Sequence, residues 1–384
     1  MLRLLIFLTA FSQIFLNRFG IQITNDFSLS VSYIFLYLSI TLAVCQGYLI
    51  TDLANLLLFS ALAASAVISY SFGIQEKSLS SLMLLLFLYL PFVFRPITTK
   101  APDLVFYRLY YPLLVVLALS GVIQFFAQFF VKPEWLFDFR QYLPPFFQNK
   151  NPMNTVIPIG SFLKGNGFFL LEPSIFSQWM AYGVCFSGVY PSSVFAMPLF
   201  LTGLAVAFSG TGVVLVLLFC IFSFFDIRRE KRLLLFVLLF CFLVFSFLTK
   251  DTLLLSRLDE FKGGTGVRTT SAAARFINPT LVLQEGWATS CLIFFFGNGP
   301  GTIARVNRDF EVHDPVWAKL FFEYGLIGGI ILLLFLHRST SGPNFNRIFR
   351  ILFFIQWFSL GGHLLTFDVL VLYVMYYKLC FPAT

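Results

Sequence analysis

Long, nearly uninterrupted apolar stretches recur along the whole chain, and they limit its possible folds more than any other feature. Hydrophobic residues make up 58% of the 384 positions and charged residues only 11%, whereas soluble domains average about 25% charged. Backbone polar groups inside hydrocarbon must pair internally, so a membrane-crossing segment is a helix or part of a closed barrel. Continuous runs, as opposed to alternating segments of roughly 10 residues, favour helices.

We therefore predict an all-α polytopic membrane protein, one integral membrane domain over 1–384 with about twelve transmembrane helices. The run 192–226 exceeds the roughly 20 residues of one crossing, and Ser209-Gly210-Thr211-Gly212 is its natural break. Residues 2–16 lack a small-residue cleavage site, so we interpret them as part of the first span and not as a signal peptide. The short first span and last two spans leave ten or eleven crossings as alternatives. The predicted spans are 2–22, 28–50, 53–73, 79–94, 105–131, 173–190, 192–208, 210–226, 233–249, 315–336, 347–362 and 366–381.

Basic residues in the short loops predict the orientation. Lysines and arginines gather on one side of the predicted membrane, whereas the short loops opposite carry only Arg18 and Lys77. The positive-inside rule then places both termini in the cytoplasm. Two longer loops face outward, 132–172 and 250–314, and the second is the large outward loop before the tenth span. The net charge of +8 suits anionic head groups and an anionic substrate equally well.

Motifs for nucleotide or metal chemistry are missing from the sequence. It has no GxxxxGK[ST] loop, no GxSxG elbow, no Asp-x-Asp pair and no His/Cys/Asp cluster with metal-ligand spacing. We therefore predict no metal, no cofactor and no nucleic-acid partner. The glycine-rich, basic stretch from Gly263 to Arg268 is either a flexible hinge or a backbone nest for an anion.

The remaining candidates are outward-loop cations and one of the three histidines. His313 lies just before Pro315, at the expected start of a helix, where a histidine is either a capping residue or a base. An imidazole with a pKa near 6.5 can take a proton from an attacking hydroxyl. Arginine forks pair with phosphate oxygens, so Arg268, Arg275 and Arg305 are candidates for binding a pyrophosphate, with ordinary loop solvation as the alternative.

A series of short motifs between about 160 and 330 then becomes informative. It consists of Gly167-Phe168, Glu172-Pro173-Ser174, Arg275, Trp287, Gly297-Asn298-Gly299-Pro300-Gly301, His313-Asp314 and Glu323-Tyr324-Gly325-Leu326-Ile327-Gly328. This series resembles the signature of the O-antigen polymerase and ligase superfamily (Wzy- and WaaL-like proteins). The predicted layout, with a large outward loop before the tenth span, is similar as well.

The resemblance implies a metal-independent glycosyltransferase of the bacterial plasma (inner) membrane, with its site facing the periplasm. Its donor would be an undecaprenyl-pyrophosphate-linked glycan and its acceptor a glycan or a lipid, with a chain-length regulator and a flippase as further partners. The family's loop histidine corresponds to His313 and its loop arginine to Arg275, which gives the predicted catalytic pair. Lys164 stands where relatives often have arginine, and Glu172 either pairs with a loop cation or orients the acceptor.

Polymerisation of lipid-linked repeats is the predicted reaction. A ligase that transfers the glycan to a lipid core or a protein is the first alternative, and a transporter or flippase is the second. Transporters usually place ionisable residues near the bilayer midplane, whereas Glu172, Lys319, Glu323 and Asp368 lie near span ends. Lys319 and Glu323 are spaced to pair on one helix. We also expect a surface helix over 280–296, and His313 within side-chain reach of Arg268, Arg275 or Arg305.

Overall fold

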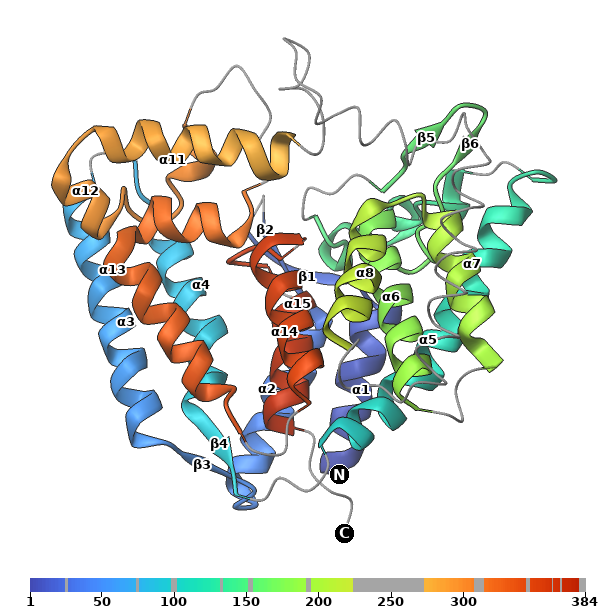
Figure 1. Cartoon of the computed structure of the whole chain (residues 1–384), viewed down its shortest axis with the longest axis horizontal. Coiled ribbons are helices and arrows are strands. Elements are labelled where there is room, and N and C mark those ends of the chain that lie inside the picture. Colours follow the sequence, from blue (N-terminus) through green and yellow to red (C-terminus); the bar gives the residue numbers. More distant parts are fainter. Residues whose placement is uncertain are drawn as a thin grey trace. The chain divides into compact units, whose positions relative to one another are not determined.

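The computed structural model describes most of the chain, and Figure 1 shows it. The described residues are 1–24, 27–73, 76–97, 102–131, 134–150, 155–190, 195–223, 273–306, 314–342, 346–360, 362–366 and 368–379. The predicted span 233–249 lies outside them, as do Arg268 and His313.

The chain folds into two compact units, each built from two separate stretches of sequence. Unit 1 comprises Met1–Ser39 and Asp103–Ser256, and unit 2 comprises Ile40–Pro102 and Arg257–Thr384. The grouping of the whole chain into one integral membrane domain stays a prediction.

Unit 1 is a helical unit with two small hairpins. Helix α6 contacts α7 and α8, and these last two are separated at Phe208, whose φ of 45° is left-handed. The predicted break near Gly210 is therefore confirmed. The described elements of unit 1 are α1 (Leu2–Phe15), β1 (Gly20–Thr24), β2 (Phe27–Ser30), α5 (Pro102–Ala127), the 3-10 turns η2 (Glu134–Leu136), η3 (Arg140–Tyr142) and η4 (Pro145–Phe147), β5 (Pro158–Ile159), β6 (Phe162–Leu163), α6 (Pro173–Val189), α7 (Met197–Ala207) and α8 (Gly210–Ser223), and α2 (Val31–Cys45) passes from unit 1 into unit 2.

In unit 2, the two long helices α3 and α13 pack against each other. The expected helix over 280–296 is present as two helices, because Ser290 starts a second helix by capping it through its side chain. The described elements of unit 2 are β3 (Leu49–Thr51), α3 (Leu53–Phe72), α4 (Leu79–Tyr89), the 3-10 turn η1 (Leu90–Val93), β4 (Phe94–Pro96), the π-helical turn η7 (Ala273–Ile277), α11 (Asn278–Ala288), α12 (Cys291–Phe296), the 3-10 turn η8 (Ile303–Arg305), α13 (Val316–Ser339), α14 (Arg347–Ile355), η9 (Gln356–Leu360), α15 (Asp368–Val374) and η10 (Met375–Leu379).

Three helices are long and apolar enough to cross a membrane, Leu53–Phe72, Leu104–Ala127 and Val316–Ser339, and several shorter apolar helices accompany them. The described chain is thus mostly helical and compatible with a membrane protein, and the count of twelve spans stays a prediction. The expected first span, 2–22, was too long. Its helix ends at Phe15, and residues from Gly20 onward pair as an antiparallel hairpin with 27–30.

Candidate functional site

The predicted site residues that the structure describes fall in both units. Lys164 and Glu172 belong to unit 1, and Arg275 and Arg305 belong to unit 2. Because His313 and Arg268 lie outside the described residues, the predicted approach of His313 to an arginine stays a prediction.

Helix α13 is broken at Gly325, which has φ 65° and ψ −171°. This conformation is open essentially to glycine alone. Figure 1 shows the result, because the first segment of α13 runs in the direction of α11 and the second turns sharply away from it. The predicted span 315–336 is therefore not one straight helix.

The glycine-rich turn 297–301 fills the break. The backbone N–H of Asn298 donates to the carbonyl of Phe322, and that of Gly299 donates to the carbonyl of Glu323, each at 2.9 Å. A continuous α-helix would pair these carbonyls with N–H groups four residues further on. The hydroxyl of Ser69, on α3, also donates to the Glu323 carbonyl. The break therefore leaves neither of these two backbone acceptors without a donor.

Close backbone contact explains why glycine is needed on both sides of this junction. A Cβ placed on Gly297 would lie 2.3 Å from the carbonyl oxygen of Glu323, and one on Gly325 would lie 2.5 Å from the backbone nitrogen of Gly297. Gly297 also has a φ of 84°. Two motifs that are far apart in sequence, 297–301 and 323–328, are thus parts of one packed junction.

The carboxylate of Glu323 lies completely buried beside this junction. Its Oε1 is 3.5 Å from the Nζ of Lys319, which confirms the predicted pair, and it accepts the backbone N–H of Ile303 at 3.4 Å. Its Oε2 has no hydrogen-bond partner among the described residues. Glu323 therefore holds η8 against α13 through its side chain, while its carbonyl holds the glycine-rich turn.

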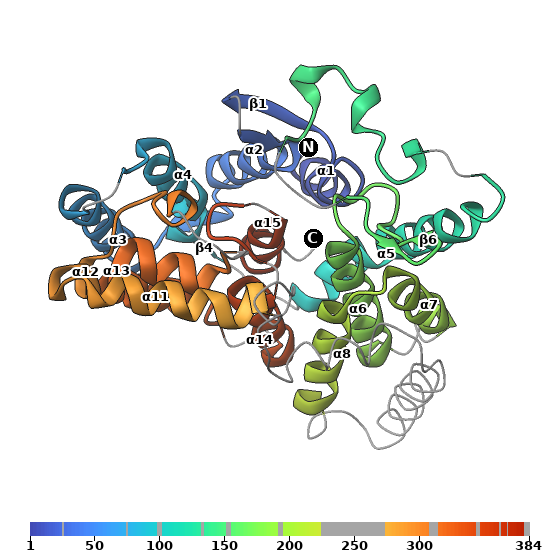
Figure 2. The ribbon, with the colours of Figure 1, turned by 90° about the horizontal axis from the view of Figure 1, so that it is seen from above.

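An apolar layer joins α11 to the first segment of α13. Val282 and Leu283 of α11 form a buried cluster with Ile303, Ala318 and Phe322. Seen from above in Figure 2, α11 and α13 run alongside each other. The two helices thus form a platform at one end of unit 2.

Of the two described candidate arginines of unit 2, one precedes α11 and the other lies between α11 and α13 in sequence. Arg275 lies half-buried in η7, the turn that leads directly into α11. Arg305 closes η8, is exposed, and lies 3.6 Å from the Oε2 of Glu76 in the connection between α3 and α4. Both side chains are therefore placed by turns that the platform anchors.

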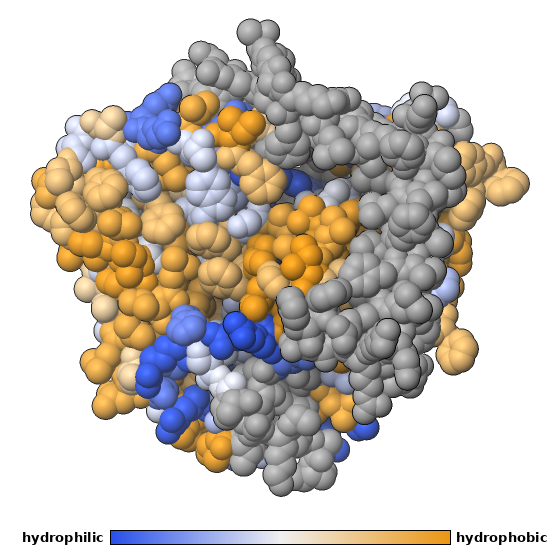
Figure 3. Space-filling model, in the orientation of Figure 1, coloured by the Kyte–Doolittle hydropathy of each residue, from blue (hydrophilic) through white to orange (hydrophobic). Residues whose placement is uncertain are grey.

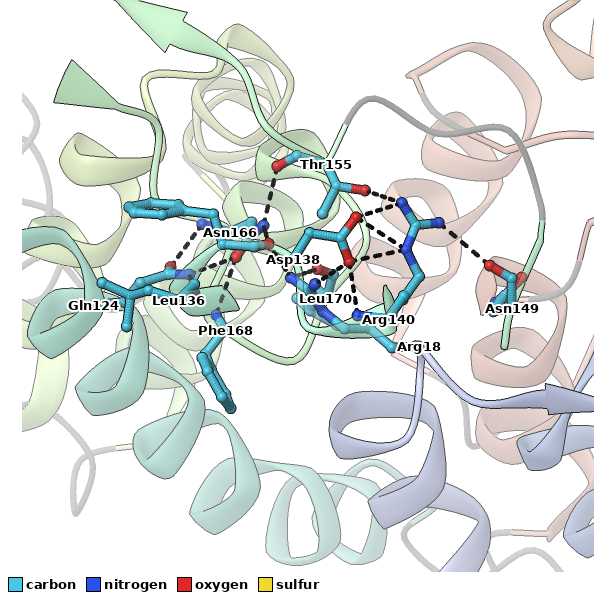
Figure 4. Close-up of polar contacts among 11 residues, drawn as sticks. Arg18, Gln124, Leu136, Asp138, Arg140, Asn149, Thr155, Asn166, Phe168 and Leu170 are labelled. Carbon is cyan, nitrogen blue, oxygen red and sulfur yellow. Dashed lines mark hydrogen bonds and ion pairs between the residues drawn. The ribbon is translucent and has the colours of Figure 1, made fainter. Parts of the chain in front are cut away.

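In unit 1, the described loop residues 134–150 and 155–172 are organised around a completely buried guanidinium, that of Arg18 (Figure 4). Arg18 donates to the Oδ1 of Asp138 at 2.9 Å and to the carbonyls of Phe137 and Leu170 at 2.6 and 3.0 Å. Arg140 binds the same carboxylate with two nitrogens, Nη2 at 2.7 Å from Oδ2 and Nε at 3.0 Å from Oδ1. Two cations thus share one carboxylate.

The charge states of this cluster follow from its burial. Burial lowers the pKa of Arg18 to about 10 although Asp138 opposes the change, so the guanidinium remains charged at neutral pH. Burial raises the pKa of Asp138, but the hydrogen bonds and positive charge of Arg140, together with the charge of Arg18, lower it further than burial raises it. The carboxylate is therefore ionised, and the cluster carries a net positive charge.

Asn166 is a second organising residue of this loop. Its buried amide donates to the carbonyls of Phe137 and Thr155 at 2.9 and 3.1 Å, and its Oδ1 accepts from Gln124 of α5 at 2.8 Å (Figure 4). The next residue, Gly167, has a φ of 73° and lets the chain turn there. The loop is thus fixed to α5 by side-chain amides.

The two predicted site residues of unit 1 lie on either side of this turn. Lys164 is buried, with 6% of its surface exposed, and its backbone N–H donates to the carbonyl of Ile157. Glu172 is half-buried, occupies the N-cap of α6 and accepts a hydrogen bond from Ser174 at 2.7 Å. The acceptor-orienting role of Glu172 stays a prediction.

The roles of Arg18, Asp138 and Asn166 were not predicted. A sequence signal exists for Arg18 alone, which is a lone charge between two apolar runs. A charge buried in such surroundings needs partners, but the sequence does not say which residues they are. No protein-family model, curated protein or solved structure matches this chain.

Proposed function

We propose that this protein is a membrane glycosyltransferase that polymerises undecaprenyl-pyrophosphate-linked oligosaccharide repeats on the outer side of the bacterial plasma membrane, without a divalent metal. The junction between the turn 297–301 and the broken α13 is the observation that supports this most. It anchors one end of the segment that runs from η8 through His313 to Pro315. A loop that carries a base and phosphate-binding cations needs such fixed ends if it is to hold a reacting geometry.

The proposed reaction is a single displacement at the anomeric carbon of the donor. His313 accepts the proton of the acceptor hydroxyl, and the hydroxyl oxygen forms the new glycosidic bond. The bond between the anomeric carbon and the pyrophosphate oxygen breaks, and undecaprenyl pyrophosphate leaves with the bonding electron pair. Arg275 neutralises the growing charge on the leaving group, with Arg268 and Arg305 as further phosphate contacts.

Two contacts to the substrate complete the proposal. Lys164 would bind the donor's phosphate or glycan, and Glu172 would orient the acceptor glycan. Both belong to the loop that Arg18 and Asn166 fix, and the cluster that Arg18 forms with Asp138 and Arg140 of this loop carries a net positive charge. A net positive surrounding suits an anionic donor.

The test uses purified protein with a lipid-linked oligosaccharide donor and EDTA in the buffer. We expect a ladder of extended glycans, and we expect His313→Ala to abolish it. His337→Ala is the matched control, because His337 lies at the far end of α13, where its Nδ1 is 2.9 Å from Arg350. Full turnover by the His313→Ala variant would refute the mechanism.

Arg275→Lys tests the phosphate role separately. The substitution keeps the charge and loses the paired donors, so we expect kcat to fall by about 100-fold or more while the protein stays folded. The measurement is single-turnover product formation at saturating donor. An unchanged rate would remove Arg275 from the catalytic pair.

A ligase would share this chemistry and differ in its acceptor. Supplying a lipid core or a protein in place of a second lipid-linked repeat distinguishes the two, because a ligase forms a single transfer product and no ladder.

A lipid-linked glycan transporter is favoured by one observation, the broken α13. Transporters present the ends of broken helices to their cargo. Here the carbonyls at the break accept hydrogen bonds from Asn298, Gly299 and Ser69, so the protein itself occupies them. Translocation of a fluorescent lipid-linked sugar by reconstituted vesicles, without glycan extension, would support the transporter instead.

A further inference from the structure

A compact group of cations lies at the end of unit 2 where β3 and β4 pair, at the far end of α13 from the platform. We propose that it binds the phosphate of an anionic glycerophospholipid whose acyl chains lie along α3 and α13. The end of α13 is about 20 Å from the break at Gly325, so this site is separate from the proposed transferase site.

Asp52 is the centre of the group. It caps α3, since its Oδ1 accepts the backbone N–H of Asn55 at 3.1 Å. Its two oxygens also meet Arg95 at 3.4 Å and Arg338 at 3.7 Å. The pairing of β3 with β4 sets Arg95 opposite Ile50. Two arginines from distant parts of the sequence are thus held beside one carboxylate.

Both guanidiniums keep capacity for a further anion. Their side chains are 59% and 52% exposed for Arg95 and Arg338, whereas that of Asp52 is 13% exposed. Each guanidinium has five N–H donors in a planar fork, and an ion pair at 3.4 Å or longer uses few of them. A phosphate can therefore approach from outside without displacing Asp52.

Further positive charge lies around the pair. Arg350 of α14 lies 2.9 Å from the ring of His337, which precedes Arg338. Asp52 supplies one negative charge to these contacts, which does not balance the positive charges of Arg95, Arg338 and Arg350. The group attracts anions.

The surface of α3 and α13 next to these cations is apolar and exposed. Leu53 and Leu57 of α3 are 71% and 63% exposed, and Leu334 of α13 is 53% exposed. Figure 3 shows hydrophobic surface over this part of the molecule, with hydrophilic residues gathered beneath it. A soluble phosphate compound would leave these leucines uncovered, whereas a phospholipid covers them and meets the arginines with its phosphate. This arrangement identifies the ligand class as a lipid.

The probe is phosphatidylglycerol, compared with phosphatidylcholine, and the readout is the number of lipids retained by the purified protein in native mass spectrometry across a lipid titration. We expect phosphatidylglycerol to be retained at lower concentrations. Arg95→Gln and Arg338→Gln should each weaken this retention about fivefold, and the double variant about thirtyfold, if each arginine contributes as juxtamembrane cations usually do.

Lys77→Gln combined with Lys150→Gln is the matched control, because it removes two positive charges elsewhere on the chain. We expect it to retain phosphatidylglycerol like the unmodified protein. Equal retention of the two lipids, or equal effects of the two double variants, would overturn the proposal.

Asp52→Asn separates binding from folding. Asparagine caps a helix as well as aspartate does, so α3 is preserved, but the carboxylate that competes for the arginines is gone. We expect retention of phosphatidylglycerol to rise several-fold. A fall would show that the arginines serve only to hold α3 and α13 together.

Discussion

Replacing Gly325 by alanine is the sharpest test of the junction at the broken helix. The substitution adds one methyl group at a position with φ 65° and ψ −171°. That group would lie 2.5 Å from the backbone nitrogen of Gly297 and 2.5 Å from the carbonyl oxygen of Phe295. The turn and the helix cannot both keep their places.

The expected loss in the free energy of unfolding has two parts. Holding alanine in this backbone region costs about 1–3 kcal/mol. Moving the turn away also weakens the hydrogen bonds from Asn298 to Phe322 and from Gly299 to Glu323, at about 1 kcal/mol net for each. We therefore expect Gly325→Ala to lower the free energy of unfolding by about 3–5 kcal/mol.

The assay is denaturant unfolding in mixed micelles, followed by tryptophan emission. Two matched glycines separate the causes. Gly47 has a φ of 72° but nothing within 4 Å of its would-be Cβ, so Gly47→Ala measures the cost of a positive φ without a close contact. Gly210 has neither a positive φ nor an atom within 4 Å of its would-be Cβ, so Gly210→Ala should show neither cost. If Gly325→Ala destabilised no more than Gly47→Ala, the close contact would be refuted. Gly297→Ala should cost less in a protein that already carries Gly325→Ala, because both disrupt one contact.

Two further predictions concern single hydrogen-bonded groups. Ser69→Ala removes the hydroxyl that donates to the Glu323 carbonyl and should cost about 1–2 kcal/mol, whereas Ser71→Ala, on an exposed face of the same helix, should cost less than about 0.5 kcal/mol in the same unfolding assay. Asp138→Asn strands the buried guanidinium of Arg18 and should cost about 3 kcal/mol or more at neutral pH. Since the pKa of Asp138 is lowered in the folded protein, its contribution is present above the unfolded pKa and is lost as pH falls through the folded pKa. The gap between the two proteins should therefore close in strong acid, and a constant gap would contradict this account.

Hydrophobic runs predicted the helices well because they depend on local composition. The helices α3, α6 and α8 begin within a residue of the predicted spans, and the division near Gly210 follows from a glycine-rich break in an overlong run. The first span was overestimated because Gly20 and its neighbours are apolar enough for a helix, yet they pair with another strand. Pairing partners of this kind are not visible in a hydropathy pattern.

The position of the break in α13 shows a different limit. Three glycines lie close together in this helix, Gly325, Gly328 and Gly329, and only Gly325 among them adopts positive φ. Nothing local distinguishes it, because the cause is the distant turn that supplies two N–H donors. The pair of Lys319 with Glu323 was predictable from spacing, whereas the contact of Glu323 with Ile303 was not.

The junction also explains why motifs so poor in reactive side chains can matter for chemistry. Glu323 acts through two different groups, since its carboxylate fixes η8 and its carbonyl fixes the turn 297–301. Both contacts lie on the same turn of α13, only two helical turns after the helix begins. The segment that carries His313 therefore follows η8, which Glu323 holds against α13, and precedes the start of α13 itself. Under the proposed function, substitutions at Gly297 or Gly325 should therefore reduce transfer, even though neither residue can touch the substrate through a side chain.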